Sequence, residues 1–170
     1  MRTLVQRPLV RLIMVGLVVL TIQTTLLAEI EPFGVILNLV LGFVIAAGVA
    51  GGPERGAIAG FVLGIMFDLV LVTPFGLSAL VFGLAGFGIG YVKTSITVEQ
   101  TWWMTCLFTF VGSAAAVVMY AVGGTLIGQE GWVRWHVLWS ALIVGLFNGA
   151  LAIPMAKIMR WTLRIEREPV

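Results

Sequence analysis

The feature that most constrains this chain is a succession of long apolar runs separated by short polar connectors. Six runs are recognised, at residues 12–28, 33–51, 56–72, 77–92, 102–127 and 137–159. Most can cross a hydrocarbon core of about 30 Å as a helix. Hydrophobic residues make up 60% of the 170 residues and charged residues only 11%, which excludes a soluble domain. The sequence therefore predicts an all-α integral membrane protein, with residues 1–170 forming one domain of six transmembrane helices.

The basic residues orient this predicted bundle. With six spans both termini lie on one side of the membrane, and that side holds nine of the ten basic residues, leaving only Arg134 on the other. Such an excess predicts that both termini are cytoplasmic. The basic arm before the first run also resembles a secretory signal. Because no small-residue cleavage motif follows it, we expect the run to remain as the first span.

The third run carries glycines at every fourth position and ends at a carboxylate. In a helix, Gly56, Gly60, Gly64 and Asp68 share one face. Small residues at this spacing let two helix backbones approach closely in a membrane. Two interpretations remain open. The stripe seats the third span against the second or fourth, or it docks another subunit or a second copy of the chain as a homodimer.

Polar side chains gather in the half of the predicted bundle away from the termini. They are Gln23, Thr24, Thr25, Asn38, Asp68, Ser78, Thr125 and Ser140, with Asn148 deeper. They predict a polar pocket between helices that opens to the extracytoplasmic side. The alternative, especially for the Ser and Thr members, is that they are ordinary residues of helix ends that bond nearby backbone.

Asp68 is the most demanding member of this group. An ionised carboxylate costs about 2.5 kcal/mol or more near the bilayer centre, so it must face protein, a cavity or water. We expect it to accept hydrogen bonds from Asn38, Asn148 or the 134–136 loop and to fix the outer end of the bundle.

Two further elements are predicted to lie at the membrane surface. Trp132, Trp135 and Trp139 follow a helical spacing, which predicts a short interfacial helix lying on the bilayer or on a partner. The last run ends in a basic stripe made of Lys157, Arg160, Arg164 and Arg167. This stripe is interpreted as an anchor on anionic lipid headgroups or as a contact with a cytoplasmic protein.

Motifs for catalysis are not found in the sequence. It contains no phosphate-binding loop, no cluster of His with carboxylates and no nucleophile paired with a base, and both His136 and Cys106 stand alone. We therefore predict a protein that is not an enzyme and holds no cofactor or metal. The basic residues mark topology, so no nucleic-acid partner is expected.

The order of a glycine-spaced helix ending in Asp, a Pro-Gly turn and a second glycine-rich helix resembles the MreD family of rod shape-determining membrane proteins. The matching positions are Gly60, Gly64, Asp68, Pro74, Gly76, Leu77, Ala79 and Gly90. The resemblance implies a non-enzymatic scaffold of the cell-elongation machinery in the bacterial inner membrane. It also implies binding to MreC and, in a larger complex, to MreB, RodA and its transpeptidase in peptidoglycan synthesis.

The resemblance suggests a contact surface and an alternative function. The outer polar layer and the loop with Trp132, Arg134 and Trp135 are the expected contacts with MreC. The family is also similar in fold to the S-components of energy-coupling-factor vitamin transporters. The alternative is therefore a subunit that binds a small molecule in an outward pocket lined by Gln23, Asn38, Asp68 and Asn148.

Overall fold

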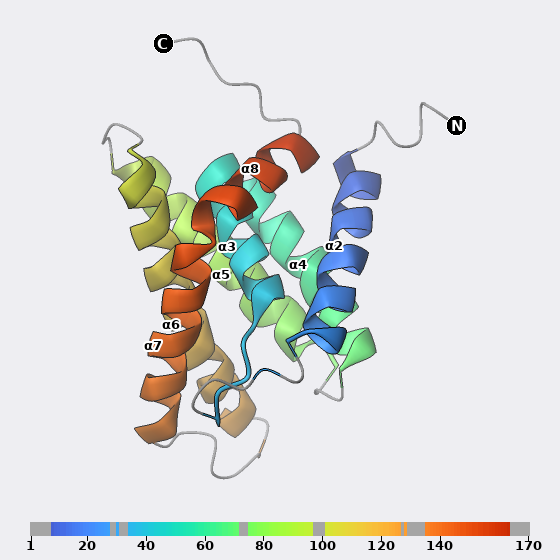
Figure 1. Cartoon of the computed structure of the whole chain (residues 1–170), viewed down its shortest axis with the longest axis vertical. Helices are drawn as coiled ribbons and strands as arrows, with labels where there is room; N and C mark the ends of the chain where they lie inside the picture. The colour runs from blue at the N-terminus through green and yellow to red at the C-terminus, as the bar shows by residue number, and fades with distance from the viewer. Residues whose placement is uncertain are drawn as a thin grey trace.

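A computed structural model describes residues 8–27, 30, 34–71, 75–96, 101–126, 128 and 135–163. Over these ranges the chain is all-helical, with α2 (Pro8–Thr25), α3 (Leu39–Gly51), α4 (Pro53–Val70), α5 (Leu77–Ser95), α6 (Trp102–Leu126), α7 (Trp135–Ala150) and α8 (Ala152–Thr162). From α2 to α7, successive helices run in opposite directions, so α2 begins and α8 ends at the same end of the bundle (Figure 1). We call this the terminal end and the opposite one the distal end.

Only some of the described helices are long and apolar enough to cross a membrane. By length and composition α2, α5 and α6 are able to cross a membrane, and α7 with α8 makes a fourth span if the bent pair counts as one. α3 is apolar but has only 13 residues, and α4 carries Glu54, Arg55 and Asp68. The fold agrees with the predicted all-α membrane protein. By length and composition, however, the described helices provide three or four spans, whereas six were predicted.

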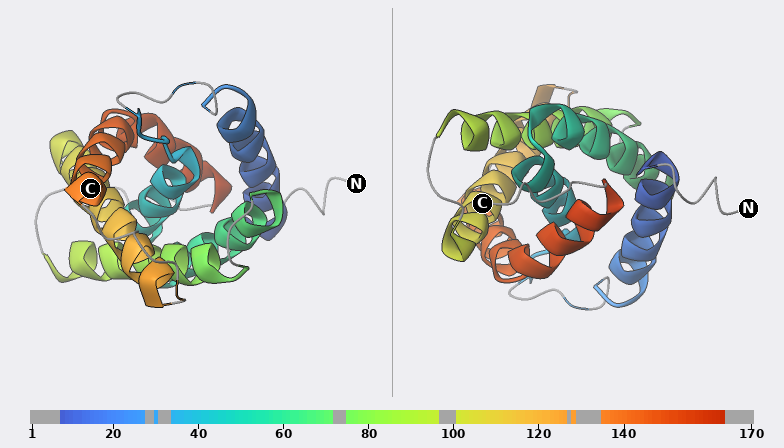
Figure 2. Two further views of the ribbon diagram at one scale, coloured as in Figure 1. Left: turned by 90° about the horizontal axis from the view of Figure 1, so that it is seen from below. Right: turned by 90° about the horizontal axis from the view of Figure 1, so that it is seen from above.

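α3 is the centre of the bundle. Every residue from Leu39 to Val49 is buried, and the other helices surround it in end-on views (Figure 2). The helix predicted from residue 33 begins only at Leu39, because residues 35–38 are not helical. This correction matters for the site, since a helix that starts inside an apolar bundle exposes backbone N–H groups that need partners.

The last predicted span is broken into two helices. α7 and α8 meet at Leu151 with a bend of 65°, and α8 turns across the terminal end of the bundle (Figure 1). Pro154 supplies the cause, since its ring clashes with the carbonyl of residue 150 and its nitrogen cannot donate to it. Pro154 in the last apolar run predicts a kink in that span, and the structure shows a sharp break just before it.

Candidate functional site

The glycine stripe of α4 lies directly on α5. A Cβ atom built on Gly64 would lie 2.5 Å from the Cα of Ala79, and one on Gly60 would lie 2.8 Å from the nitrogen of Gly83. Gly56 meets the backbone of α5 in the same way. Backbone atoms cannot rotate aside as a side chain can, so these positions require glycine. The stripe seats the third predicted span against the fourth, and its contact face is not free to dock a second copy.

Asp68 caps the helix that follows it. Its Oδ2 accepts hydrogen bonds from the backbone N–H groups of Gly76, at 2.8 Å, and Ala79, at 3.3 Å, while Oδ1 accepts from that of Ser78, at 3.3 Å. Gly76 is the N-cap of α5 and has no side chain to cap it, so the carboxylate supplies that function and also meets the positive end of the helix dipole. The sequence did not predict these three backbone donors, and Arg134 of the predicted 134–136 loop lies outside the described residues. Asn148 donates elsewhere.

The glycine stripe and Asp68 therefore form one structural unit with the turn after α4. Gly60 and Gly64 bring α5 close enough for the carboxylate of Asp68 to reach its first turn. Gly76 has a φ of 95°, a left-handed conformation that favours glycine. Pro74, the other predicted turn residue, lies outside the described residues.

Gln23 bonds backbone groups at the start of α3, which begins later than the sequence predicted. Its side-chain amide donates to the carbonyl of Leu37 and accepts from the N–H of Leu39, at 2.7 Å. Gln23 is 5% exposed, so the pairing lies in the interior. Asn38 caps the same helix, accepting from the N–H of Leu41 at 2.9 Å. The two amides thus replace part of the helical hydrogen bonding that residues 35–38 do not provide.

Asn148 joins α7 to this non-helical segment and to α6. Its Nδ2 donates to the carbonyl of Asn38 and to Ser113 Oγ, both at 3.1 Å. Its Oδ1 has no hydrogen-bond partner among the described residues and lies against Gly42, where a Cβ would approach it to 2.6 Å. Sequence reasoning did not single out Ser113, because one serine in an apolar run carries no signal until a partner faces it.

A cavity of about 470 Å³ lies at the distal end beside the start of α3. Gln23, Asn38, Tyr120 and Ser140 line it among mostly apolar neighbours, whereas Asp68 and Asn148 do not. The structure thus divides the predicted polar layer into two groups. Gln23 and Asn38 border the cavity, and Asp68 holds the α4–α5 unit.

The predicted outer contact surface is described only in part. Trp135 begins α7 and is 86% exposed, which makes it available to a partner. Trp132 and Arg134 lie outside the described residues. Within the described ranges, no three His, Cys, Asp or Glu side chains gather as a metal site.

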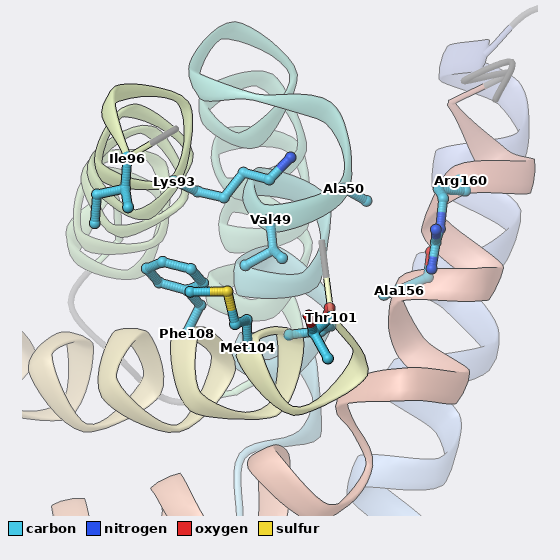
Figure 3. Close-up of a pocket in the computed structure, with 10 residues that line it drawn as sticks. Val49, Ala50, Lys93, Ile96, Thr101, Met104, Phe108, Ala156 and Arg160 are labelled. Atoms are coloured by element: carbon cyan, nitrogen blue, oxygen red, sulfur yellow. The ribbon is translucent and has the colours of Figure 1, made fainter. Parts of the chain in front are cut away.

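A second, smaller cavity lies at the terminal end and was not predicted from the sequence. It has a volume of about 40 Å³ and is lined by residues from α3, α5, α6 and α8. Lys93 and Arg160 border it from opposite sides (Figure 3). Lys93 and Arg160 were assigned by sequence only to topology or to a basic stripe.

Comparison with known proteins identifies the family. A family model described as rod shape-determining protein MreD matches residues 5–162. No curated protein and no solved structure matches the chain. The family match covers all seven described helices, including the α4–α5 unit. The chain therefore belongs to the MreD family of membrane proteins, a membership that fits a role in determining rod shape.

Proposed function

We propose that this chain is a non-enzymatic scaffold that binds MreC in the bacterial inner membrane and links it to the elongation machinery. The proposal rests on the observation that the buried polar side chains form hydrogen bonds within the chain. They are Gln23, Asp68, Ser78, Thr109, Ser113, Asn148 and Thr162. Each hydrogen-bonds to another group of the chain, and among their described polar atoms only the Oδ1 of Asn148 is left without a partner. A transport path or a catalytic centre needs polar groups left for a substrate, whereas a rigid support uses them to hold its helices.

The proposal includes a topology of six spans with both termini in the cytoplasm. In support, the chain direction alternates from α2 to α7, so that α3 and α4 run antiparallel to each other (Figure 1). The short α3 reaches the distal end through residues 35–38, where Gln23 bonds the carbonyl of Leu37 and Asn148 bonds that of Asn38. An interrupted span is tolerated where neighbouring protein satisfies its backbone groups.

The proposed contact with MreC lies at the distal end. Gln23, Asp68 and Asn148 are at most 6% exposed, so they shape this end from within and do not touch the partner. Trp135, like Phe75, is an exposed aromatic residue there, and tryptophan is enriched where proteins bind each other. Through MreC the scaffold would position MreB, RodA and its transpeptidase during peptidoglycan synthesis.

Site-specific cross-linking tests this contact. A photo-reactive amino acid is placed at Trp135, or at Trp102 as a control, because Trp102 is also exposed, at 70%, but begins a helix at the terminal end. We expect a cross-link to MreC from position 135 and none from position 102. Cross-linking from position 102 alone would contradict a distal contact, and failure of MreC to co-purify would contradict the scaffold itself.

The distal cavity supports a second candidate function, a small-molecule binding subunit like a vitamin-transporter S-component. Its volume of about 470 Å³ is within the range of ligand pockets. Both ends of the Gln23 amide already bond backbone, so the cavity favours a largely apolar ligand. Mass spectrometry of the purified protein tests this candidate. A retained small molecule that is lost in Val144→Trp, a substitution in the cavity wall, would support it.

A further inference from the structure

The cavity at the terminal end brings two cations to one small space. Lys93 comes from the last turn of α5, and Arg160 comes from α8, which the break at Leu151 turns across this end. Figure 3 shows the two side chains on opposite sides of the cavity, with Thr101, which directly precedes α6, and Met104 of α6 below them. The arrangement exists only because α8 departs from the direction of α7.

These two cations are not neutralised within the described part of the chain. Arg160 donates its Nε to the carbonyl of Ala156, at 3.3 Å, and no described carboxylate forms an ion pair with Lys93 or Arg160. The lining residues that the structure describes include no Asp or Glu. Two like charges beside one partly buried space repel each other, and an anion placed between them removes that repulsion.

Other features of the cavity suit an anion. Thr105 lies in the first turn of α6, a helix of 25 residues, and lines the cavity with Thr101. The N-terminus of a helix is partly positive and presents N–H groups, and the hydroxyl of Thr105 can donate to an oxyanion. A volume of about 40 Å³ holds about three water-sized groups, which is enough for one phosphate group but not for a nucleotide.

The position of the cavity indicates where the phosphate comes from. Trp102 and Trp103 begin α6 and are 70% and 49% exposed, and Trp161 on α8 is 60% exposed. Exposed tryptophans mark the depth of lipid headgroups in membrane proteins. We propose that Lys93 and Arg160 bind the phosphate group of an anionic phospholipid, which fastens α8 to α5 and α6.

The test compares lipid binding by the full-length chain and three variants in detergent. Lys93→Gln and Arg160→Gln each remove one cation of the site, and Lys157→Gln removes an exposed cation of α8 that does not line the cavity. Thermal unfolding is followed while short-chain phosphatidylglycerol is added. We expect the lipid to raise the melting temperature of the wild type and Lys157→Gln. We also expect about tenfold weaker apparent binding in each of the other two variants.

The lipid-free melting temperatures make the result interpretable. Without lipid, Lys93→Gln and Arg160→Gln should melt no lower than the wild type, because each relieves the repulsion between the cations. Equal responses of all four proteins to the lipid would overturn the site, as would an equal loss in Lys157→Gln or lower melting of both site variants without lipid. Full stabilisation by inorganic phosphate alone would overturn the assignment to a lipid.

Discussion

Two sides of this bundle are held together in opposite ways. On one side α4 and α5 meet backbone to backbone at Gly60 and Gly64. On the other side α2 stands apart from α8 across an apolar groove of about 460 Å³. There α2 is fastened near its two ends, by Gln23 to the start of α3 and by Arg11, whose guanidinium lies 4.8 Å from the Trp161 ring centroid.

The difference shows how a bundle of small and apolar residues can be rigid without tight packing everywhere. In lipid there is little hydrophobic gain from bringing two apolar helices together, so close packing and hydrogen bonds decide which helices associate. The glycine stripe joins helices by close packing, and the polar side chains join them by hydrogen bonds. The predictions below separate these contributions, from the largest expected effect to the smallest.

Gln23→Ala should be the most damaging change on the loosely packed side. It leaves the carbonyl of Leu37 and the N–H of Leu39 without partners, and two buried unsatisfied groups cost about 2–6 kcal/mol together. Unfolding in SDS, followed by tryptophan fluorescence, measures the loss. Thr24→Ala is the matched control, because that exposed hydroxyl bonds only backbone of its own helix. Equal losses in the two variants would show that the amide does not hold α2 to α3.

Asp68→Asn should weaken the join between α4 and α5. The substitution exchanges one oxygen acceptor for an NH₂ donor facing the N–H groups of Gly76 and Ala79 or of Ser78. The free energy of unfolding should fall by about 1.5–3 kcal/mol, the range for hydrogen bonds to charged groups. Hydrogen exchange of the first turn of α5 should rise with it. Unchanged exchange there would contradict capping by Asp68.

Gly60→Ala should destabilise the closely packed side by about 1–3 kcal/mol, because one methyl group is forced against the backbone of α5. Gly88→Ala, on α5, is the matched control. A Cβ there meets nothing within 4 Å, so the variant should be neutral or more stable by up to about 1 kcal/mol from helix propensity. The difference in unfolding free energy between the two variants measures the cost of separating the backbones. Similar values for both would contradict backbone contact.

Val18→Leu should have the smallest effect, within about 0.5 kcal/mol. Val18 is 60% exposed and lines the groove between α2 and α8, so an added methylene group meets open space. The same unfolding assay should give a curve that overlaps the wild type. A loss comparable to that of Gly60→Ala would show that the groove is closed by close packing.

The parts of the site that were predictable from sequence depend on helix geometry alone. Residues four apart share a face wherever the helix lies, so Gly60, Gly64 and Asp68 could be aligned without knowing their partners. Pro154 likewise marks a break by its covalent structure. The fold class followed from the apolar runs, and the family followed from the order of glycines, Asp and turn.

The partners of the polar residues were not predictable in the same way. Asp68 accepts hydrogen bonds from backbone N–H groups. Every residue except proline carries such a group, so residue types do not show which N–H groups will donate to the carboxylate. The start of α3 at Leu39 was missed because an apolar run looks helical throughout, while Gln23 on another helix satisfies the groups left over.

The sequence by itself determined that this chain is a helical membrane protein with a glycine face ending in a carboxylate, because periodicity and composition are local properties. Only the tertiary structure decided that this face is closed by α5, that Gln23 supports an interrupted helix, and that Lys93 and Arg160 share a cavity. The physical reason is that hydrogen bonds and charge interactions join groups far apart in the chain. Their energy depends on the distances between those groups, which the folded arrangement alone sets.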